Sequence, residues 1–210
     1  EQRSEEAKAW KRPHADSEPW FLRTNETLTY LAITKDFVTY KRLGRITDAR
    51  EDDRDVVIFP RKINGKFYMI SRPVIDGDRS MWISSSDDLM EWRTRQKLYS
   101  GVEEWESGRV GAGCPPIETE DGWVLIYHGV SKTDSCYRVG LMLLDKEKPE
   151  KILARTKDFV LEPAADYEKS GLYQGCVFPT GAVVKDGTLY VYYGCADKYV
   201  SLATAKMDEV

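Results

Sequence analysis

Three copies of one hairpin pattern constrain the fold of this chain more than any other feature of its sequence. Each copy has a short apolar strand, a two-residue turn and an aromatic strand, and the turns are Asn64-Gly65, Asp121-Gly122 and Asp186-Gly187. Asn-Gly and Asp-Gly are the strongest short signals for a hairpin, because a type I′ turn needs positive φ at both central residues. The pattern therefore predicts antiparallel sheets built on one plan.

Each hairpin is followed by one more β-type segment, at residues 80–85, 137–144 and 199–205. The three units are marked by Pro60, Pro116 and Pro179. Units of three or four antiparallel strands at this spacing are typical of a β-propeller. We therefore expect an all-β fold, an incomplete propeller of about three and a half blades over residues 27–210, after a divergent segment at residues 1–26. A β-sandwich whose hairpins are alike by chance is the alternative.

Composition excludes several classes of function. The formal net charge of the 210 residues is −4, so there is no overall basic field to hold nucleic acid or an anionic membrane. No apolar run approaches the ~20 residues that a membrane helix needs. The 4 cysteines form no CxxC pair and the chain has only 2 histidines, so we expect no metal site. Unpaired cysteines and a charged start favour a cytoplasmic location.

Ionisable residues recur at one end of the predicted hairpins. Arg54 precedes the inner strand of the first hairpin and Arg72 closes its second strand. Arg109 and His128 occupy the same places in the next hairpin, and Tyr137 opens the strand after it. Since these ends lie at one rim of a propeller, they predict an anion pocket, whose guanidinium forks match phosphate oxygens. The alternative is a set of solvated rim arginines paired with Glu51, Asp52, Asp53 and Asp55.

Two further residues are candidates for contact with a sugar. Asp197 follows the second strand of the third hairpin, which places it at the same rim. Trp105 lies in a predicted loop, where its ring could stack on a sugar face. Trp92 and Trp123 occupy repeat positions, so we expect them in the core.

The segments that carry these features resemble glycoside hydrolase family 130, a family of five-bladed propellers that act on β-mannosides. The matching segments keep their order and spacing, and they are residues 55–67, 72–73, 81–84, 111–117, 123–130, 137–140, 178–182 and 192–197. The resemblance implies inverting phosphorolysis of a β-mannosidic linkage, as in phosphorylases of β-1,4-mannooligosaccharides and mannosyl-glucose. The substrates would be a mannose-containing oligosaccharide and inorganic phosphate, the product α-mannose 1-phosphate, and no other cofactor is implied.

The resemblance also carries expectations for single residues. It implies phosphate contacts for Arg54, Arg72, Arg109, His128 and Tyr137, and a sugar contact for Asp197. Arg109 stands where Lys is frequent, and Asp55 stands where some relatives have Asn. A carboxylate beside an anion site weakens phosphate binding unless it pairs elsewhere.

The sequence departs from the family at the general acid. An inverting enzyme needs an acid to protonate the leaving oxygen, and in this family that Asp lies in an early Glu-Asp-Pro-Arg motif. The sequence has no such motif, so no catalytic residue is assigned, and the first blade is expected to be missing. Asp52 and Asp53 are not given this role, because they lie at the wrong repeat position.

Several alternatives follow from the absent motif. The chain is a fragment, a degenerate copy or a protein completed by another chain. Its function is that of a β-mannoside phosphorylase, a β-mannosidase of the same family or a non-catalytic carbohydrate-binding propeller. An incomplete propeller has an open sheet edge, which favours pairing with another copy, so a homo-oligomer is also expected.

Overall fold

The computed structural model describes residues 27–48 and 51–210, and the segment 1–26 that the sequence analysis set apart lies outside the described residues. The described chain is made almost entirely of antiparallel strands. A two-stranded ribbon comes first, and it consists of β1 (Tyr30–Ile33) and β2 (Lys41–Arg45). A four-stranded sheet follows, and its strands in order are β3 (Asp53–Ile58), β4 (Phe67–Pro73), β5 (Met81–Ser86) and β6 (Trp92–Tyr99).

The second sheet has an interrupted inner strand. Its strands are β7 (Arg109–Ala112), β8 (Ile117–Glu118), β9 (Trp123–Val130), β10 (Tyr137–Leu144) and β11 (Ile152–Arg155). Both β7 and β8 pair with β9, and the break between them contains Pro115 and Pro116. Proline has no N–H to donate to a strand neighbour, so the ladder stops where these residues occur.

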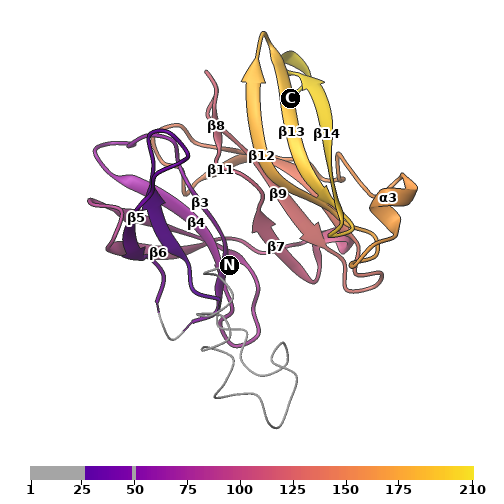
Figure 1. The fold of residues 1–210 in the computed structure, drawn as a ribbon, viewed down its shortest axis with the longest axis horizontal. Helices are drawn as coiled ribbons and strands as arrows, with labels where there is room; N and C mark the ends of the chain where they lie inside the picture. The colour runs from indigo at the N-terminus through magenta and orange to yellow at the C-terminus, as the bar shows by residue number, and fades with distance from the viewer. Residues whose placement is uncertain (1–26, 49–50) are drawn as a thin grey trace.

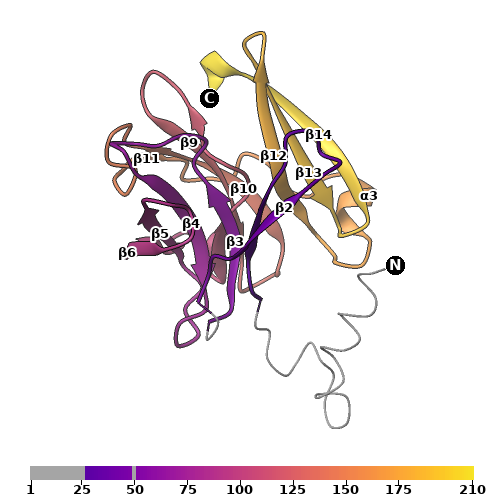
Figure 2. The same ribbon diagram turned by 60° about the vertical axis from the view of Figure 1, so that its left-hand side comes forward.

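The third sheet has three strands, namely β12 (Val177–Lys185), β13 (Thr188–Cys195) and β14 (Tyr199–Lys206). Three short helical turns complete the described structure: η2 (Glu104–Glu106), α3 (Asp166–Lys169) and η3 (Met207–Glu209). Figures 1 and 2 show the sheet of β7–β11 standing between the other two sheets, as successive blades do. The ribbon and three sheets confirm the predicted incomplete propeller, and the β-sandwich alternative is wrong.

The three hairpin turns do not share one geometry. Asn64 and Gly65 have φ of 51° and 81°, and Asp186 and Gly187 have φ of 51° and 70°, as a type I′ turn requires. In the middle hairpin only Gly122 has positive φ, at 152°. A Cβ on Gly122 would lie 2.2 Å from the carbonyl oxygen of Leu144, so close packing against β10 also requires glycine there.

One core cluster lies between the first two full sheets and centres on β9, and a second cluster lies between the second and third sheets. All eight residues of β9 are buried, and Trp123, Leu125 and Tyr127 pack in one cluster with residues of β3–β5. The carboxylate of Glu106 is buried in this core, where it accepts hydrogen bonds from the hydroxyls of Tyr99 (2.5 Å) and Tyr127 (2.9 Å). A buried carboxylate with such donors holds η2 against the sheet.

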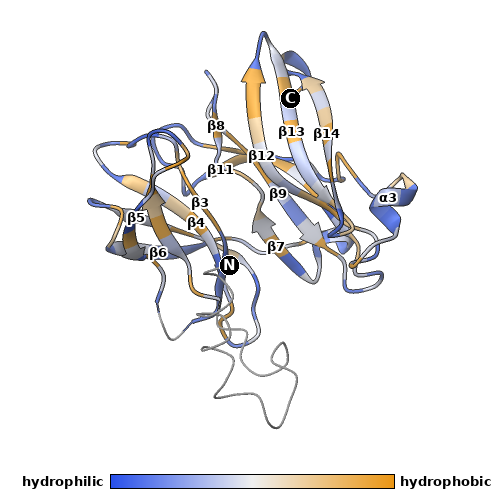
Figure 3. Ribbon diagram, in the orientation of Figure 1, coloured by the Kyte–Doolittle hydropathy of each residue, from blue (hydrophilic) through white to orange (hydrophobic). Residues whose placement is uncertain are grey.

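The third sheet leaves apolar side chains in solvent. Figure 3 shows hydrophobic stretches along β12, and Val183, Val200 and Leu202 are 50%, 77% and 45% exposed. Within the described residues β14 pairs only with β13. The predicted homo-oligomer stays a prediction. None of the helices in the described ranges has the length and apolar character needed to cross a membrane.

Candidate functional site

Strand register brings the predicted rim residues to one end of neighbouring sheets. Arg54 of β3 lies directly opposite Arg72 of β4. In the next sheet, Val130 at the end of β9 is opposite both Arg109 of β7 and Tyr137 of β10. Four of the five residues expected at a phosphate site therefore lie where two blades meet.

These residues line one small cavity of about 190 Å³. The lining consists of Asp52, Arg54, Arg72, Val74, Arg79, Arg109 and Tyr137. This volume is roughly that of six molecules in liquid water. The cavity is therefore of a size that suits a small anion rather than a sugar. Arg79, in the connection between β4 and β5, has no counterpart in the hairpin repeat, and so the sequence analysis missed it.

Behind the cavity, Arg72 is held by a buried carboxylate. Arg72 Nη1 lies 2.9 Å from Asp55 Oδ2, and both side chains are about one-tenth exposed or less. Asp55 lies in a bulge of β3 with φ of 51°, and this bulge interrupts the pairing between Arg54 and Val57. Bulges re-aim side chains, and this one directs the Asp55 carboxylate to Arg72. Burial alone would raise the pKa of Asp55, but His128 and Arg72 hold it below the ordinary value.

His128 is fully buried beside the same carboxylate. Its Nε2 lies 3.3 Å from Asp55 Oδ2 and 3.5 Å from Arg72 Nη1. Burial lowers the pKa of His128, so the ring is neutral near neutral pH, and we assign the ring proton to Nε2, which faces the carboxylate. The ring centroid lies 4.5 Å from that of Phe178. His128 therefore fixes Asp55, which in turn fixes Arg72.

Arg109 is positioned by tyrosines. Its Nη2 donates a hydrogen bond of 2.7 Å to the Tyr137 hydroxyl, and its guanidinium carbon lies 4.9 Å from the centre of that ring. Tyr137 in turn packs edge-on against Tyr173, whose hydroxyl donates to the carbonyl of Ser135 at 2.8 Å. This contact ties the segment after α3 to the rim.

The alternative of rim arginines paired with acids is correct for part of the set. Arg54 Nε lies 2.8 Å from Asp52 Oδ1, and Arg72 pairs with Asp55. Glu51 pairs instead with Arg95 of β6, at 2.5 Å. The acids are thus arranged behind and beside the guanidinium groups. They orient those groups and still leave them lining the cavity.

Asp53 belongs to the opposite face of β3. Its Oδ2 accepts a hydrogen bond of 3.1 Å from Ser71 Oγ, whereas its Oδ1 is buried and has no hydrogen-bond partner among the described residues. Burial raises the pKa of Asp53 to about 6. Asp53 does not line the arginine cavity.

We expect Asp53→Asn to stabilise the protein near neutral pH. The folded state holds the proton of Asp53 more tightly than the unfolded state, whose pKa is near 3.8, so stability falls as pH rises from there to about 6. Above that range the ionised, buried carboxylate is unfavourable, and the variant should be more stable by ~1–3 kcal/mol. Urea denaturation of both proteins across this pH range measures the difference. A difference that does not change with pH would contradict the assignment.

The prediction that Trp105 contacts sugar is wrong. Trp105 lies in η2, is only 6% exposed and packs against Tyr127 and Phe159. Its Nε1 donates to the carbonyl oxygen of Lys157 at 2.9 Å. With its ring covered and its N–H used, Trp105 has no face to present to a sugar, and it serves as a core residue instead.

Asp197 lies on the expected rim but outside the arginine cavity. It follows β13, has φ of 55° and is exposed. The preceding residue, Ala196, donates its N–H to the carbonyl of Cys176 at 3.0 Å, and Cys176 forms a bridge with Tyr137. The position leaves the carboxylate open to a ligand that extends beyond the cavity.

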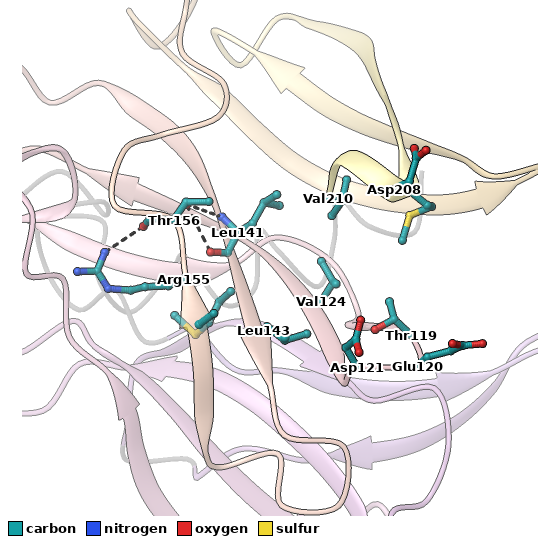
Figure 4. Close-up of a pocket in the computed structure, with 13 residues that line it drawn as sticks. Thr119, Glu120, Asp121, Val124, Leu141, Leu143, Arg155, Thr156, Asp208 and Val210 are labelled. Atoms are coloured by element: carbon teal, nitrogen blue, oxygen red, sulfur yellow. Dashed lines mark hydrogen bonds between the residues drawn. The ribbon is translucent and has the colours of Figure 1, made fainter.

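A larger cavity, of about 600 Å³, lies at the other end of the second sheet (Figure 4). In Figure 4, Arg155 lies apart from Glu120, Asp121 and Asp208, and it donates to the carbonyl of Thr156 at 3.0 Å. These charged groups do not converge on a common point, unlike the arginines of the smaller cavity. Within residues 27–48 and 51–210 no group of three His, Cys, Asp or Glu side chains could hold a metal ion.

Comparison with known proteins identifies the family. A sequence model of glycoside hydrolase family 130, described as β-1,4-mannooligosaccharide phosphorylase, matches residues 23–210. The chain belongs to this family. The resemblance drawn from the hairpin motifs is therefore confirmed, and so is the family's propeller fold.

This family 130 chain is similar to several mannoside phosphorylases. It is 42% identical to the 1,2-β-oligomannan phosphorylase of Thermoanaerobacter sp. (strain X514) over 181 residues, which cover 86% of this chain and 59% of that protein. It is 40% identical to the β-1,4-mannooligosaccharide phosphorylase of Ruminococcus albus over 167 residues, covering 75% and 49%. The chain thus spans only about half the length of the curated relatives it matches.

A solved structure agrees with this assignment. The β-1,2-mannobiose phosphorylase of Listeria innocua, in complex with β-1,2-mannobiose, matches the chain with a TM-score of 0.81 and 42% identity. The match covers 86% of this chain and 51% of that protein. The three relatives are named for two different linkages, 1,2 and 1,4, so family membership does not by itself select the linkage.

Proposed function

We propose that this chain carries the phosphate site of an inverting β-mannoside phosphorylase. The observation that carries the proposal is the cavity of about 190 Å³ lined by four arginines and Tyr137. Guanidinium groups bind phosphate oxygens in pairs, and here Asp55 and His128 hold one of them rigidly. The similar proteins are named as mannoside phosphorylases, and this is the basis for proposing phosphorolysis here.

In this reaction phosphate takes the place of water. One phosphate oxygen attacks the anomeric carbon of the terminal β-mannosyl unit, on the face opposite the glycosidic oxygen. The carbon–oxygen bond to the leaving sugar breaks, that oxygen takes up a proton, and α-mannose 1-phosphate forms with inversion. Arg54, Arg72 and Arg109 would hold the phosphate and orient its attacking oxygen, and Asp197 would contact the sugar. We assign no described residue as the proton donor.

The cavity favours phosphorolysis over hydrolysis. A hydrolase of the same family needs room for a water molecule but has no use for several guanidinium groups around it. A propeller that binds sugar without turnover is the second alternative. We also propose that the substrate is a mannose-containing oligosaccharide and that the protein is cytoplasmic.

The test is a product assay on this chain. It would be incubated with β-1,2-mannobiose, β-1,4-mannobiose or mannosyl-glucose, with and without phosphate. We expect mannose 1-phosphate only when phosphate is present, and a loss of about a hundredfold or more in Arg109→Ala. Arg61→Ala is the control, since Arg61 pairs with Glu118 outside the cavity. Free mannose without phosphate would establish a hydrolase, and sugar binding without either product would leave a fragment of the enzyme or a binding module.

A further inference from the structure

Arg79 brings a fourth guanidinium group to the cavity from a connection between strands. Within this connection the chain makes a tight turn, in which Ile75 and Asp78 form an antiparallel bridge through their backbone hydrogen bonds. The carbonyl of Arg79 accepts the N–H of Val110 at 3.2 Å, and Val110 follows Arg109 on β7. This hydrogen bond joins two blades and fixes the backbone of Arg79 beside the cavity that its side chain lines.

The other three arginines of the cavity already have partners. Arg54 pairs with Asp52, Arg72 pairs with Asp55, and Arg109 donates to Tyr137. Arg79 has neither an ion pair nor a side-chain hydrogen bond with any residue in the described ranges, and its side chain is exposed. The neighbouring carboxylate, Asp78, is already used by Lys97 and Ser80.

The charges around the cavity do not balance. Four guanidinium groups face two carboxylates, those of Asp52 and Asp55, and His128 is neutral because burial lowers its pKa. Among the described residues the site therefore has two positive charges in excess, and one of them comes from Arg79. Inorganic phosphate is mostly a dianion at about pH 8, so its charge equals this excess.

We propose that Arg79 makes the cavity selective for a dianion, by supplying its second uncompensated positive charge at the mouth. Arg79 would contact the outward oxygens of the phosphate, while Arg72 and Arg109 hold those that face inward. The inference rests on the proposed phosphate site. It adds a residue that selects the charge state of the nucleophile.

The test measures anion binding to the whole chain by calorimetry at about pH 8. The probes are inorganic phosphate and sulfate, which are dianions, and nitrate, which is a monoanion. For Arg79→Ala we expect phosphate and sulfate to bind about tenfold more weakly, with a smaller change for nitrate. Arg79→Lys keeps the charge and should retain the preference for dianions. Arg93→Ala is the matched control, because Arg93 is exposed and pairs with Glu91 away from the cavity.

The outcomes separate this inference from the function on which it rests. If the folded wild-type chain binds neither phosphate nor sulfate, the proposed phosphate site is wrong, and the role of Arg79 is wrong with it. If the wild type binds phosphate, Arg109→Ala weakens that binding and Arg79→Ala does not, only the role of Arg79 is wrong. Equal losses for nitrate and sulfate in Arg79→Ala would also overturn selectivity by charge.

Discussion

Replacing Arg72 with methionine is expected to destabilise the protein by ~3–5 kcal/mol and to abolish measurable phosphate binding. Arg72 is buried, and its guanidinium is the cationic partner nearest to the carboxylate of Asp55. Without it, Asp55 is left as a buried charge whose nearest side chain among the described residues is the neutral ring of His128. Removing one member of a buried ion pair costs far more than removing an exposed one, because the remaining charge has lost its hydration.

A second substitution separates the two effects. In Arg72→Met combined with Asp55→Asn, no charge is left unpaired, so most of the lost stability should return while phosphate binding stays lost. Urea denaturation and phosphate calorimetry measure these quantities. Arg93→Met, in an exposed pair with Glu91, should change stability by less than about 0.5 kcal/mol. A similarly small change in Arg72→Met would mean that Asp55 is not held by Arg72.

Gly111→Ala is expected to disrupt the site although it adds a single methyl group. A Cβ at Gly111 would lie 2.0 Å from Asp55 Oδ2 and 2.7 Å from His128 Cε1. Neither neighbour can move freely, because Asp55 is set by a bulge and the His128 ring is fully buried. The added atom must push the carboxylate away from Arg72. We expect a loss of ~1–3 kcal/mol in stability and a drop of at least about tenfold in phosphate affinity.

The matched control for this variant is Gly181→Ala. Gly181 also lies in a strand, and a Cβ there would have no atom within 4 Å. Neither glycine has positive φ, so the two variants differ in crowding rather than in backbone strain. The Gly181 variant should keep its stability within about 0.5 kcal/mol and its phosphate affinity unchanged. Equal behaviour of the two variants would show that the contact between Gly111 and Asp55 does not hold the site.

The repeat explains why so much of the site was predictable. Arg54, Arg72 and Arg109 stand at equivalent ends of successive hairpins, and a two-residue turn fixes the register of each hairpin locally. Equivalent positions of neighbouring blades face the same rim, so these arginines and Tyr137 meet at one cavity. No contact between distant residues had to be known for this prediction.

The errors and omissions involve residues outside the repeat. The sequence predicts a loop at Trp105, but η2 packs this side chain against β9, and the nearby acidic residues give no sign of its burial. Arg79 was missed because its connection has no equivalent in the other hairpins. The sequence does not show which group pairs with Asp55, since a bulge with φ of 51° decides where its carboxylate points.

The sequence by itself determined the strands, the antiparallel pairing, the family and the rim at which the arginines gather. Those features depend on local turn chemistry and on an apolar pattern that repeats along the chain. Only the tertiary structure decided which groups pair within the site: Arg72 with Asp55, Asp55 with His128, and Arg109 with Tyr137. These five residues lie on the five strands β3, β4, β7, β9 and β10, and the contact between Asp55 and His128 forms only when the two sheets pack. Their burial then sets the pKa of His128 and the cost of leaving Asp55 unpaired.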